Sequence, residues 1–295
     1  MLLLLLLLLL LGVSALLLKF VTADGDFTLM SKKHVKRDEI EDKVVWITGA
    51  SRGIGEILAK QLANLGAKLI LSARNEAELE RVKAQLTGKH APDGVQILPL
   101  DLASGEDSLR QAVEKAESFF GGSGVDIMIH NAAFERPKTT ALDVTEESLK
   151  MSSAAGKTPA PGQAVYSASK FALNGYFHTF RSELFQKGIK VTVVCPGPIE
   201  TSNGSGETAS TKRSSSEKRV SSERCAELTI IAASHGLKEA WISYQPVLAV
   251  MYLVQYMPTM GYFLMDKIGG NRVEAAARKG NTYSLGLIFG KGKAA

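Results

Sequence analysis

The sequence predicts an α/β protein built on a doubly wound, mostly parallel sheet. Beyond residue 43, short apolar runs alternate with segments of helical periodicity, and strands that alternate with helices in this way form parallel sheets. A glycine-rich turn at 48–55 joins the first apolar run to the first helical segment. Ahead of the sheet, residues 2–18 are apolar almost throughout, which predicts a membrane-anchor helix.

The elements follow in order from the apolar runs and their capping residues. The expected strands are 44–47, 69–71, 95–102, 125–129, 189–194 and 240–244. The expected helices include 54–65, the first turns of a helix at 144–150, and 166–188. Another is capped by Asn75, with Glu78 as its capping-box partner, and ends at Leu86. A further helix begins at Ser104 and has Leu109, Val113, Ala116 and Phe120 on one face.

The remaining segments complete the domain organisation. Residues 1–20 form the anchor, 21–42 a linker, 43–265 the folded domain and 266–295 a basic tail. Residues 202–223 are rich in serine and charge, which predicts a flexible loop inside the domain. The stretch 241–265 is apolar and interrupted by Pro246 and Pro258, so it is either the wall of an apolar pocket or a membrane-docking surface.

Composition excludes several other classes. The 295 residues are 45% hydrophobic and 22% charged, which argues against a disordered chain. Two distant cysteines, Cys195 and Cys225, argue against a disulfide-stapled domain or a cysteine-rich zinc module, and no metal site is predicted. The net charge of +5 is dispersed without interleaved aromatic residues, so no nucleic-acid partner is expected.

The apolar N-terminus allows two interpretations, a retained anchor and a cleaved signal. No basic residue precedes the run and no small-residue cleavage site follows it, which favours the anchor. Basic residues follow the run, so the positive-inside rule places the body in the cytosol. The glycosylation sequon at 203–205 would be used only on the lumenal side.

The glycine-rich turn is a candidate nucleotide site because it lies between a strand and a helix. Glycines there let the backbone approach a pyrophosphate, and the helix N-terminus supplies N–H donors and a partial positive charge. The candidate binding residues in the turn are Thr48, Gly49, Ser51, Arg52, Gly53, Ile54 and Gly55.

The residue after the second strand indicates which dinucleotide is bound. An NAD site places an Asp or Glu there to bind the ribose 2′-hydroxyl. This chain has Arg74 instead, and Arg52 lies inside the turn. Two guanidinium groups suit a 2′-phosphate, so NADP(H) is the expected cofactor.

A second cluster carries proton-transfer chemistry. Tyr166 and Lys170 are four residues apart on an expected helix and share a face. An ammonium beside a phenol favours the phenolate and so makes it a usable acid–base group near neutral pH. Ser153 precedes them and offers a hydrogen bond to a substrate carbonyl oxygen.

Taken together, these motifs resemble the short-chain dehydrogenase/reductase superfamily. The matching residues, spread over about 160 positions of this Rossmann-like pattern, are Thr48-Gly49-x-x-x-Gly53-x-Gly55, Asp101, Asn131-Ala132, Ser153, Tyr166-x-x-x-Lys170 and Pro196-Gly197-Pro198-Ile199-x-Thr201. The apolar N-terminus is typical of a membrane-associated eukaryotic branch, and endoplasmic-reticulum membrane is the implied location.

The resemblance implies a role for each site residue. Tyr166 acts as the general acid in carbonyl reduction or the base in alcohol oxidation, Lys170 lowers its pKa and holds the nicotinamide ribose, and Ser153 positions the carbonyl. The other cofactor contacts are Asp101 to the adenine, Asn131 to the cofactor edge and Thr201 to the carboxamide. The implied substrate is an apolar carbonyl or alcohol, such as a steroid, retinoid or lipid-like compound.

The chain departs from the family between Asn131 and Ser153. Only 21 residues lie there, and a parallel strand needs a crossover of about a dozen residues besides the strand itself. About 30 residues, one helix and one strand, are missing at the Lys150–Met151 junction. The family's catalytic Asn and its usual dimer-forming helix lie in that segment, so oligomerisation is doubtful.

Two functions remain open on this sequence. The first is a membrane-associated NADP(H)-dependent oxidoreductase. The second is a catalytically inactive splice or truncated variant that retains at most nucleotide or partner binding. The junction at 150–151 separates them, because 43–131 contains the complete nucleotide motif whatever is missing after it.

Overall fold

The computed structural model describes residues 1–132, 152–159, 163–200 and 218–277. Its strands are β1 (Val44–Thr48), β2 (Lys68–Ser72), β3 (Val95–Ile97), β4 (Ile127–Ile129), β5 (Val193–Pro196), β6 (Ile199–Glu200), β7 (Val220–Ser221) and β8 (Glu239–Ile242). Its α-helices are α1 (Leu2–Thr22), α2 (Phe27–Met30), α3 (Gly53–Asn64), α4 (Glu76–Ala84), α5 (Glu106–Gly122), α6 (Ala164–Leu184), α7 (Ser222–Ser234), α8 (Val247–Tyr256) and α9 (Pro258–Ala277). Short 3₁₀ helices are η1 (Arg37–Glu39), η3 (Ala154–Gly156) and η4 (Phe185–Lys187).

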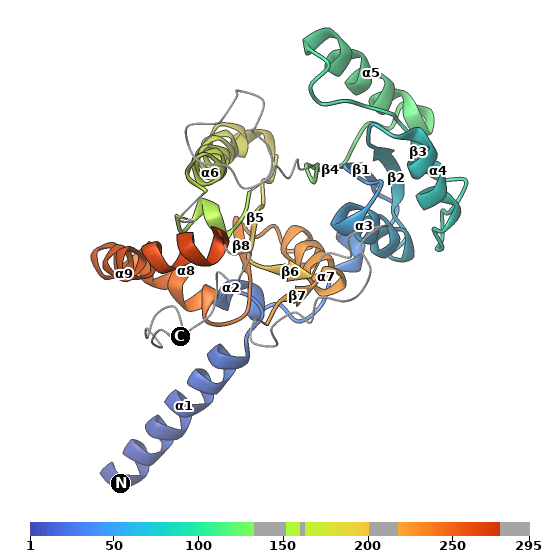
Figure 1. The fold of residues 1–295 in the computed structure, drawn as a ribbon. Coiled ribbons are helices and arrows are strands. Elements are labelled where there is room, and N and C mark those ends of the chain that lie inside the picture. The colour runs from blue at the N-terminus through green and yellow to red at the C-terminus, as the bar shows by residue number, and fades with distance from the viewer. Residues whose placement is uncertain (133–151, 160–162, 201–217, 278–295) are drawn as a thin grey trace, which may run out of the picture.

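The N-terminal half of the body is a four-stranded parallel sheet in the order β3-β2-β1-β4 (Figure 1). All five residues of β1 are buried, as expected for a parallel strand covered on both faces. Val45 and Ile47 pack in one core with α3 and α4, while Trp46 packs in another with α5. The predicted α/β architecture with a parallel sheet is confirmed.

The remaining strands do not extend this sheet. β5 pairs with β8, and β6 with β7, each as a separate two-stranded parallel sheet. The predicted Rossmann-like parallel architecture stands, and within the described residues its strands are divided among three sheets. The break falls between β4 and β5, where the sequence lacks the length for a crossover and a strand. Without a strand to fill that place, β5 does not come within the roughly 4.8 Å at which neighbouring strands pair.

Helix α7 holds the two halves together, and it was not predicted from the sequence. Ala226 and Ile230 belong to the core shared with α3, whereas Leu228 and Ile231 belong to the core beneath β8. Figure 1 shows α7 between α3 and β8. Ser221 caps the helix by accepting a hydrogen bond from the Arg224 N–H at 3.1 Å.

The segment 21–42, expected as a linker, packs onto the body. Leu29 is fully buried against α7 and β8, and Gly25 forms an antiparallel bridge with Ile242. Asp26 accepts hydrogen bonds from the backbone N–H groups of Thr28 and Trp241. The apolar side chains in this segment are too few and too irregularly spaced to show a periodicity, so its packing could not be predicted from the sequence.

Several predicted boundaries also change. α5 begins at Glu106 rather than Ser104, because the Ser104 hydroxyl donates to the Asp101 carbonyl at 2.6 Å instead of capping the helix. The buried face of α5 carries Ala112 and Ala116, while Val113 is exposed. β7 and the start of α7 lie inside the range 202–223 expected as a loop.

Other limits differ less, and some predictions cannot be compared. β3 ends at Ile97, although the Leu98 and Leu100 N–H groups still donate to β2 and the residue after it. α9 runs to Ala277 within the expected tail. The expected helix start at 144–150, Thr201, and residues 202–217 and 278–295 lie outside the described residues.

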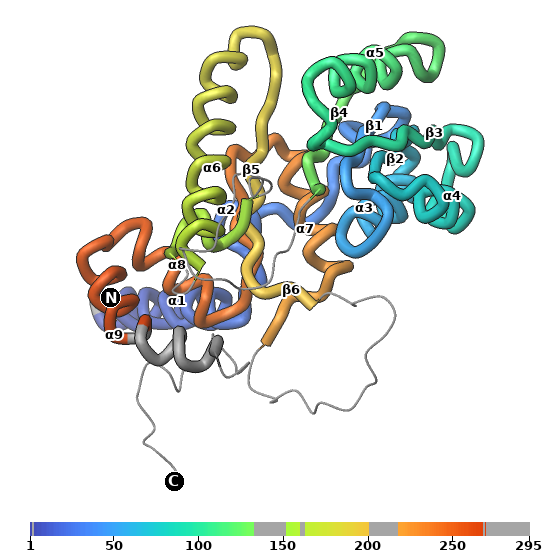
Figure 2. Tube along the Cα trace, turned by 45° about the horizontal axis from the view of Figure 1, so that its top comes forward, coloured from blue at the N-terminus to red at the C-terminus, as the bar shows by residue number. Residues whose placement is uncertain are grey.

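Helix α1 projects from the body, and none of its apolar stretch Leu3–Thr22 is buried. It is the one helix in the described part of the chain that is long and apolar enough to cross a membrane. Figures 1 and 2 both show α1, α8 and α9 on the side of the body away from the β1–β4 sheet.

Candidate active site

The glycine-rich turn is packed closely at two of its glycines and open at the third. A Cβ on Gly55 would lie 2.1 Å from the Gly49 carbonyl oxygen, and one on Gly49 would lie 2.7 Å from the Ala132 Cα. Gly53 has a φ of +58° and no atom within 4 Å of an added Cβ. Gly49 and Gly55 therefore shape the turn, whereas Gly53 leaves room beside the N-terminus of α3.

Asn131 fastens the end of β4 to this turn. Its Nδ2 donates to the carbonyl oxygens of Thr48 and Gly49, both at 3.1 Å. The Thr48 hydroxyl oxygen accepts from the N–H groups of Asn131 and Ala132, both at 3.2 Å. The structure thus brings Asn131 to the predicted turn, where its side chain is occupied in holding the backbone.

The turn fits the pyrophosphate of a dinucleotide. No side chain caps α3, so the N–H groups of its first turn face the open space at Gly53. Ile54 is partly buried against the cores on either side and fixes the helix. A bound dinucleotide would be held by these backbone donors, with Thr48, Gly49, Ser51 and Gly55 shaping the approach.

Arg81, which the sequence analysis missed, braces the same turn from α4. Its Nη2 donates to the Ser51 carbonyl at 3.0 Å and to Glu56 at 2.8 Å, and its Nε donates to Glu78 at 2.8 Å. The hydrogen bond from Arg81 holds the pKa of Glu56 below its ordinary value. The only sequence signal for this contact is the Glu78–Arg81 spacing, which is common on surface helices.

Arg52 and Arg74 lie at the same edge of the sheet. Thr48 at the end of β1 is in register with Ser72 at the end of β2, and the Ala50 N–H donates to the Ser72 carbonyl at 3.1 Å. Both arginines are exposed, and neither forms an ion pair with another described residue. The exposure of both guanidinium groups leaves them accessible to a phosphate beside the turn.

Asp101 follows β3, the neighbour of β2. Its carboxylate accepts from the Ala103 N–H at 3.1 Å, and the side chain is exposed at the carboxyl edge of the sheet. Asp101 therefore lies two strands from the glycine turn, because β3, β2 and β1 are consecutive strands; its contact with the adenine stays a prediction.

Tyr166 and Lys170 lie together on α6, as their spacing predicts. The Lys170 ammonium is 4.8 Å from the centre of the Tyr166 ring. Lys170 is buried, whereas Tyr166 is 42% exposed, so part of the Tyr166 side chain reaches solvent. Burial lowers the pKa of Lys170 to about 8, which leaves it mostly charged at pH 7.

Ser153 lies at the start of η3, and its hydroxyl is already engaged. It donates to the Pro196 carbonyl at 3.3 Å and accepts from the Ala155 N–H at 3.2 Å. To bind a carbonyl substrate, the hydroxyl must rotate away from Pro196, which its long hydrogen bond permits.

Asn174, one turn beyond Lys170, fixes η3 against α6. Its Nδ2 donates to the Gly156 carbonyl at 2.9 Å, and its Oδ1 accepts from the Ser152 hydroxyl. A Cβ on Gly156 would lie 2.9 Å from the Lys170 carbonyl oxygen, so the approach requires glycine. Asn174 therefore sets the position of Ser153 relative to Lys170, a role that the sequence analysis did not assign.

The structure groups the predicted residues into two sets rather than one. Thr48 to Gly55 and Asn131 belong to the β1–β4 sheet, whereas Ser153, Tyr166 and Lys170 belong to the part built on β5 and β8. The His130 ring after β4 lies 5.6 Å from the Phe177 ring of α6, which links the two sets directly.

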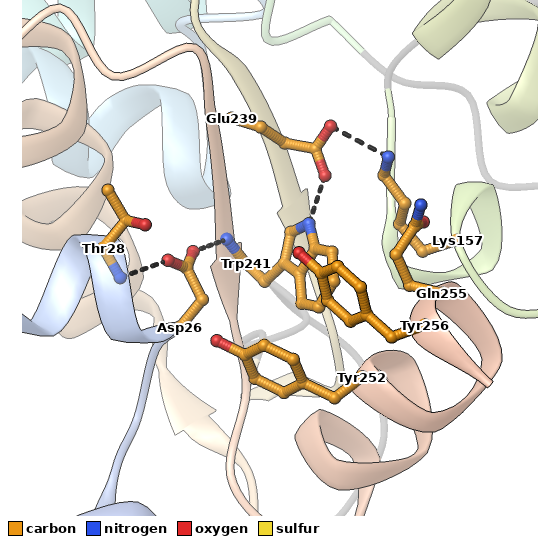
Figure 3. Close-up of a pocket in the computed structure, with 8 residues that line it drawn as sticks. All are labelled: Asp26, Thr28, Lys157, Glu239, Trp241, Tyr252, Gln255 and Tyr256. Atoms are coloured by element: carbon orange, nitrogen blue, oxygen red, sulfur yellow. Dashed lines mark hydrogen bonds and ion pairs between the residues drawn. The ribbon is translucent and has the colours of Figure 1, made fainter.

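A cavity of about 280 Å³ lies between the start of α2, β8 and α8 (Figure 3). It is lined by Asp26, Thr28, Lys157, Glu239, Trp241, Tyr252, Gln255 and Tyr256. Lys157, just after η3, forms an ion pair with Glu239 of β8 at 2.8 Å. None of the predicted site residues lines this cavity.

The burial of Lys170 predicts a measurable pH dependence of stability. Its pKa is about 8 in the folded chain and about 10.5 in the unfolded chain, so between these values the unfolded state binds more protons and stability rises with pH. Lys170→Met is therefore expected to be more stable than the parent at pH 7 by on the order of 2–3 kcal/mol. Urea unfolding of both full-length chains from pH 7 to 10 measures this.

The test uses the difference in free energy of unfolding between the parent and Lys170→Met, because the other titrating groups contribute equally to both chains. The advantage of Lys170→Met should shrink steadily above pH 8 as the parent's ammonium loses its proton. A constant difference across the range, or a parent more stable at pH 7, would show that Lys170 is not held at a burial cost.

The parallel sheet, the glycine turn on its carboxyl edge and the Tyr–Lys pair define a nucleotide-dependent α/β oxidoreductase. The family model for short chain dehydrogenase matches residues 43–150 and 147–212, two pieces that meet at the junction where the sequence lacks a crossover. The chain belongs to the short-chain dehydrogenase/reductase family.

Known proteins agree with this assignment. The human "Dehydrogenase/reductase SDR family member 7" is 35% identical over 300 residues, covering 88% of each chain. "11-beta-hydroxysteroid dehydrogenase A" of Arachis hypogaea is 34% identical over 56% of this chain and 54% of its own. The solved 3-ketoacyl-(acyl-carrier-protein) reductase from Brucella melitensis, complexed with NADH, superimposes with a TM-score of 0.56 at 24% identity, covering 69% of this chain and 96% of its own.

Proposed function

We propose that the chain is a membrane-anchored, NADP(H)-dependent oxidoreductase that interconverts a carbonyl and an alcohol on an apolar substrate. The observation that carries the cofactor choice is the pair Arg52 and Arg74, exposed beside the open glycine turn. A 2′-phosphate neutralises and hydrogen-bonds both groups, which a ribose hydroxyl does not.

The anchor and the substrate class rest on two further supports. α1 is long enough to span a bilayer and none of its apolar stretch Leu3–Thr22 is buried, and we assign the chain to a membrane, with the endoplasmic reticulum as the compartment. The relative named as a hydroxysteroid dehydrogenase supports a steroid-like, retinoid-like or lipid-like substrate. Such compounds concentrate in the bilayer to which α1 would hold the enzyme.

Each predicted site residue has a separate role in the proposed reaction. Bound NADP(H) supplies or accepts the hydride at the substrate carbon. Tyr166 gives its proton to the carbonyl oxygen in reduction and takes it back in oxidation, while the Lys170 ammonium stabilises the phenolate that results. Ser153, released from Pro196, donates a hydrogen bond to the substrate oxygen, and Asp101 and Thr201 bind the cofactor at its two ends.

The split sheet favours a second candidate function, a nucleotide-binding form without turnover. Within the described residues, the Tyr166 set is joined to the nucleotide set by α7 and the His130–Phe177 contact, and no strand but β1 pairs with β4. A misplacement of about 1 Å between reacting groups costs roughly 100-fold in rate.

Turnover of the full-length chain in phosphatidylcholine nanodiscs distinguishes the two. NADPH consumption is followed with steroid, retinal and aliphatic ketone substrates, beside Tyr166→Phe and beside a chain with a family segment inserted at 150–151. The proposal expects turnover that falls at least about 100-fold in Tyr166→Phe with NADPH binding unchanged. Binding without turnover, restored by the insertion, would establish the second candidate instead.

A further inference from the structure

Helices α8 and α9 carry a cluster of large apolar side chains that face solvent. We call this cluster the α8–α9 apolar surface, and its members are Tyr256, Met257, Met260, Tyr262 and Phe263, with exposed fractions from 44% to 71%. Outside α1, no other eight consecutive residues of the described chain expose as many large apolar side chains. Large apolar side chains exposed together on one short stretch of chain are typical of an interaction site.

The two helices pack through their opposite faces. A Cβ on Gly261 would lie 2.6 Å from the Cα of Val254, so the helices meet closely there. Met265, one turn further along α9, is buried on the same side. Met260 and Phe263 consequently point away from α8, and the Lys267 ammonium lies 4.5 Å from the Phe263 ring.

The end of α1 is fixed to this part of the molecule by specific contacts. The Phe20 ring, in the last turn of α1, lies 5.3 Å from Phe27 and 5.8 Å from Tyr252 of α8. The Gln245 side chain donates to the Phe20 carbonyl at 3.0 Å. The Tyr252 ring stacks at 6.0 Å on Tyr256, the first member of the apolar surface.

These contacts constrain where a membrane must lie. If α1 spans the bilayer, its last turn lies at the boundary between hydrocarbon and headgroups. Tyr252 contacts Phe20 of that turn and Tyr256 contacts Tyr252, so both tyrosines lie near the same boundary. Tyrosine is enriched at that depth because its ring is apolar and its hydroxyl is polar. In Figures 1 and 2, α8 and α9 lie on the side of the body from which α1 leaves.

We propose that the α8–α9 apolar surface lies in the headgroup region of the same bilayer that α1 spans. The inference rests on the proposed anchor and adds a second, monotopic contact that fixes the orientation of the body. Met260 and Phe263 enter the acyl boundary, while the Lys267 ammonium beside the Phe263 ring stays among the headgroups.

The cavity of Figure 3 lies on this boundary in the proposed arrangement. Tyr252 and Tyr256 line it on the side of α8, and Asp26 and Thr28 line it just after α1. Docking of the α8–α9 apolar surface would therefore place this cavity next to the membrane.

Quenching by lipid measures the contact directly in the full-length chain. A single cysteine is placed at Met260→Cys, at Leu10→Cys within α1, or at Val113→Cys, an exposed apolar position on α5. Burial raises the pKa of Cys195 to about 11 and of Cys225 to about 12, so these native thiols stay unlabelled near pH 7. Each chain carries a nitrobenzoxadiazole label in phosphatidylcholine nanodiscs with doxyl-labelled lipid, and the chain without an added cysteine gives the background.

The label at 260 is expected to be quenched at least about threefold more than the label at 113, since interfacial helices sit about 5–10 Å into the headgroup boundary. The label at 10 should be quenched as well. Quenching at 10 with none at 260 overturns the docking inference and leaves the anchor intact. Loss of quenching at both positions overturns the anchor and the docking together.

Discussion

Replacing Arg52 and Arg74 together with glutamine is expected to weaken NADPH binding roughly 30- to 100-fold, because hydrogen bonds to charged groups contribute about 1.5–3 kcal/mol and these two are exposed to salt. NADH has no 2′-phosphate, so its affinity should change little. Both guanidinium groups lie at the carboxyl edge of β1 and β2 and have no carboxylate partner among the described residues. Titration of cofactor fluorescence with the full-length chain measures both affinities.

A matched control separates this effect from a general loss of positive charge. Arg110 is an exposed arginine on α5 that forms an ion pair with Glu106 of the same helix at 2.7 Å. Arg110→Gln should leave NADPH affinity unchanged at the ionic strength at which the double variant fails. Equal losses for NADPH and NADH in the double variant would contradict the assignment of the 2′-phosphate site.

Gly53→Ala is expected to lower the affinity for either dinucleotide at least about 10-fold, since its methyl group would occupy the space into which the N-terminus of α3 directs its N–H donors. Apart from the chain neighbours of Gly53 and the backbone of its own helix, no described atom lies within 4 Å of that methyl position, so no packed side chain has to be displaced. The positive φ of +58° adds strain of about 1–2 kcal/mol to the folded state.

Gly121→Ala provides the control for that strain. Gly121 has a φ of +74° and likewise no atom within 4 Å of an added Cβ, but it lies in α5, away from the turn. Both variants should lose similar stability in urea unfolding, and only Gly53→Ala should lose nucleotide affinity. If both variants bind NADPH as the parent does, the pyrophosphate does not lie at the glycine turn.

Local sequence signals were enough to predict the nucleotide part of the fold. The apolar run before the glycines marks β1, and Asn75 caps α4 by accepting from the Glu78 N–H at 3.3 Å. The spacing of Tyr166 and Lys170 places both on one face of α6. In each case the information lies within a few residues, where the helix and strand periods apply directly.

The missed features depend on contacts between distant segments. Asp26 binds the Trp241 N–H across 215 positions, and Arg81 reaches Ser51 across 30. α7 has little contrast between its faces because it is buried on both, so its periodicity does not stand out. The division into three sheets likewise follows from the short stretch between Asn131 and Ser153. Its length shows that one strand is missing, but it does not show which of the remaining strands separate from the sheet.

The central claim is that the nucleotide-binding part is complete even though the sheet is divided beyond β4. Titration of the unmodified full-length chain with NADPH, beside NADH, tests it most directly. The account predicts saturable binding of one nucleotide per chain, with NADPH tighter than NADH by the same factor that the Arg52/Arg74 variant loses. An absence of saturable binding would contradict the claim, because it would mean that the glycine turn, though formed, does not hold a dinucleotide.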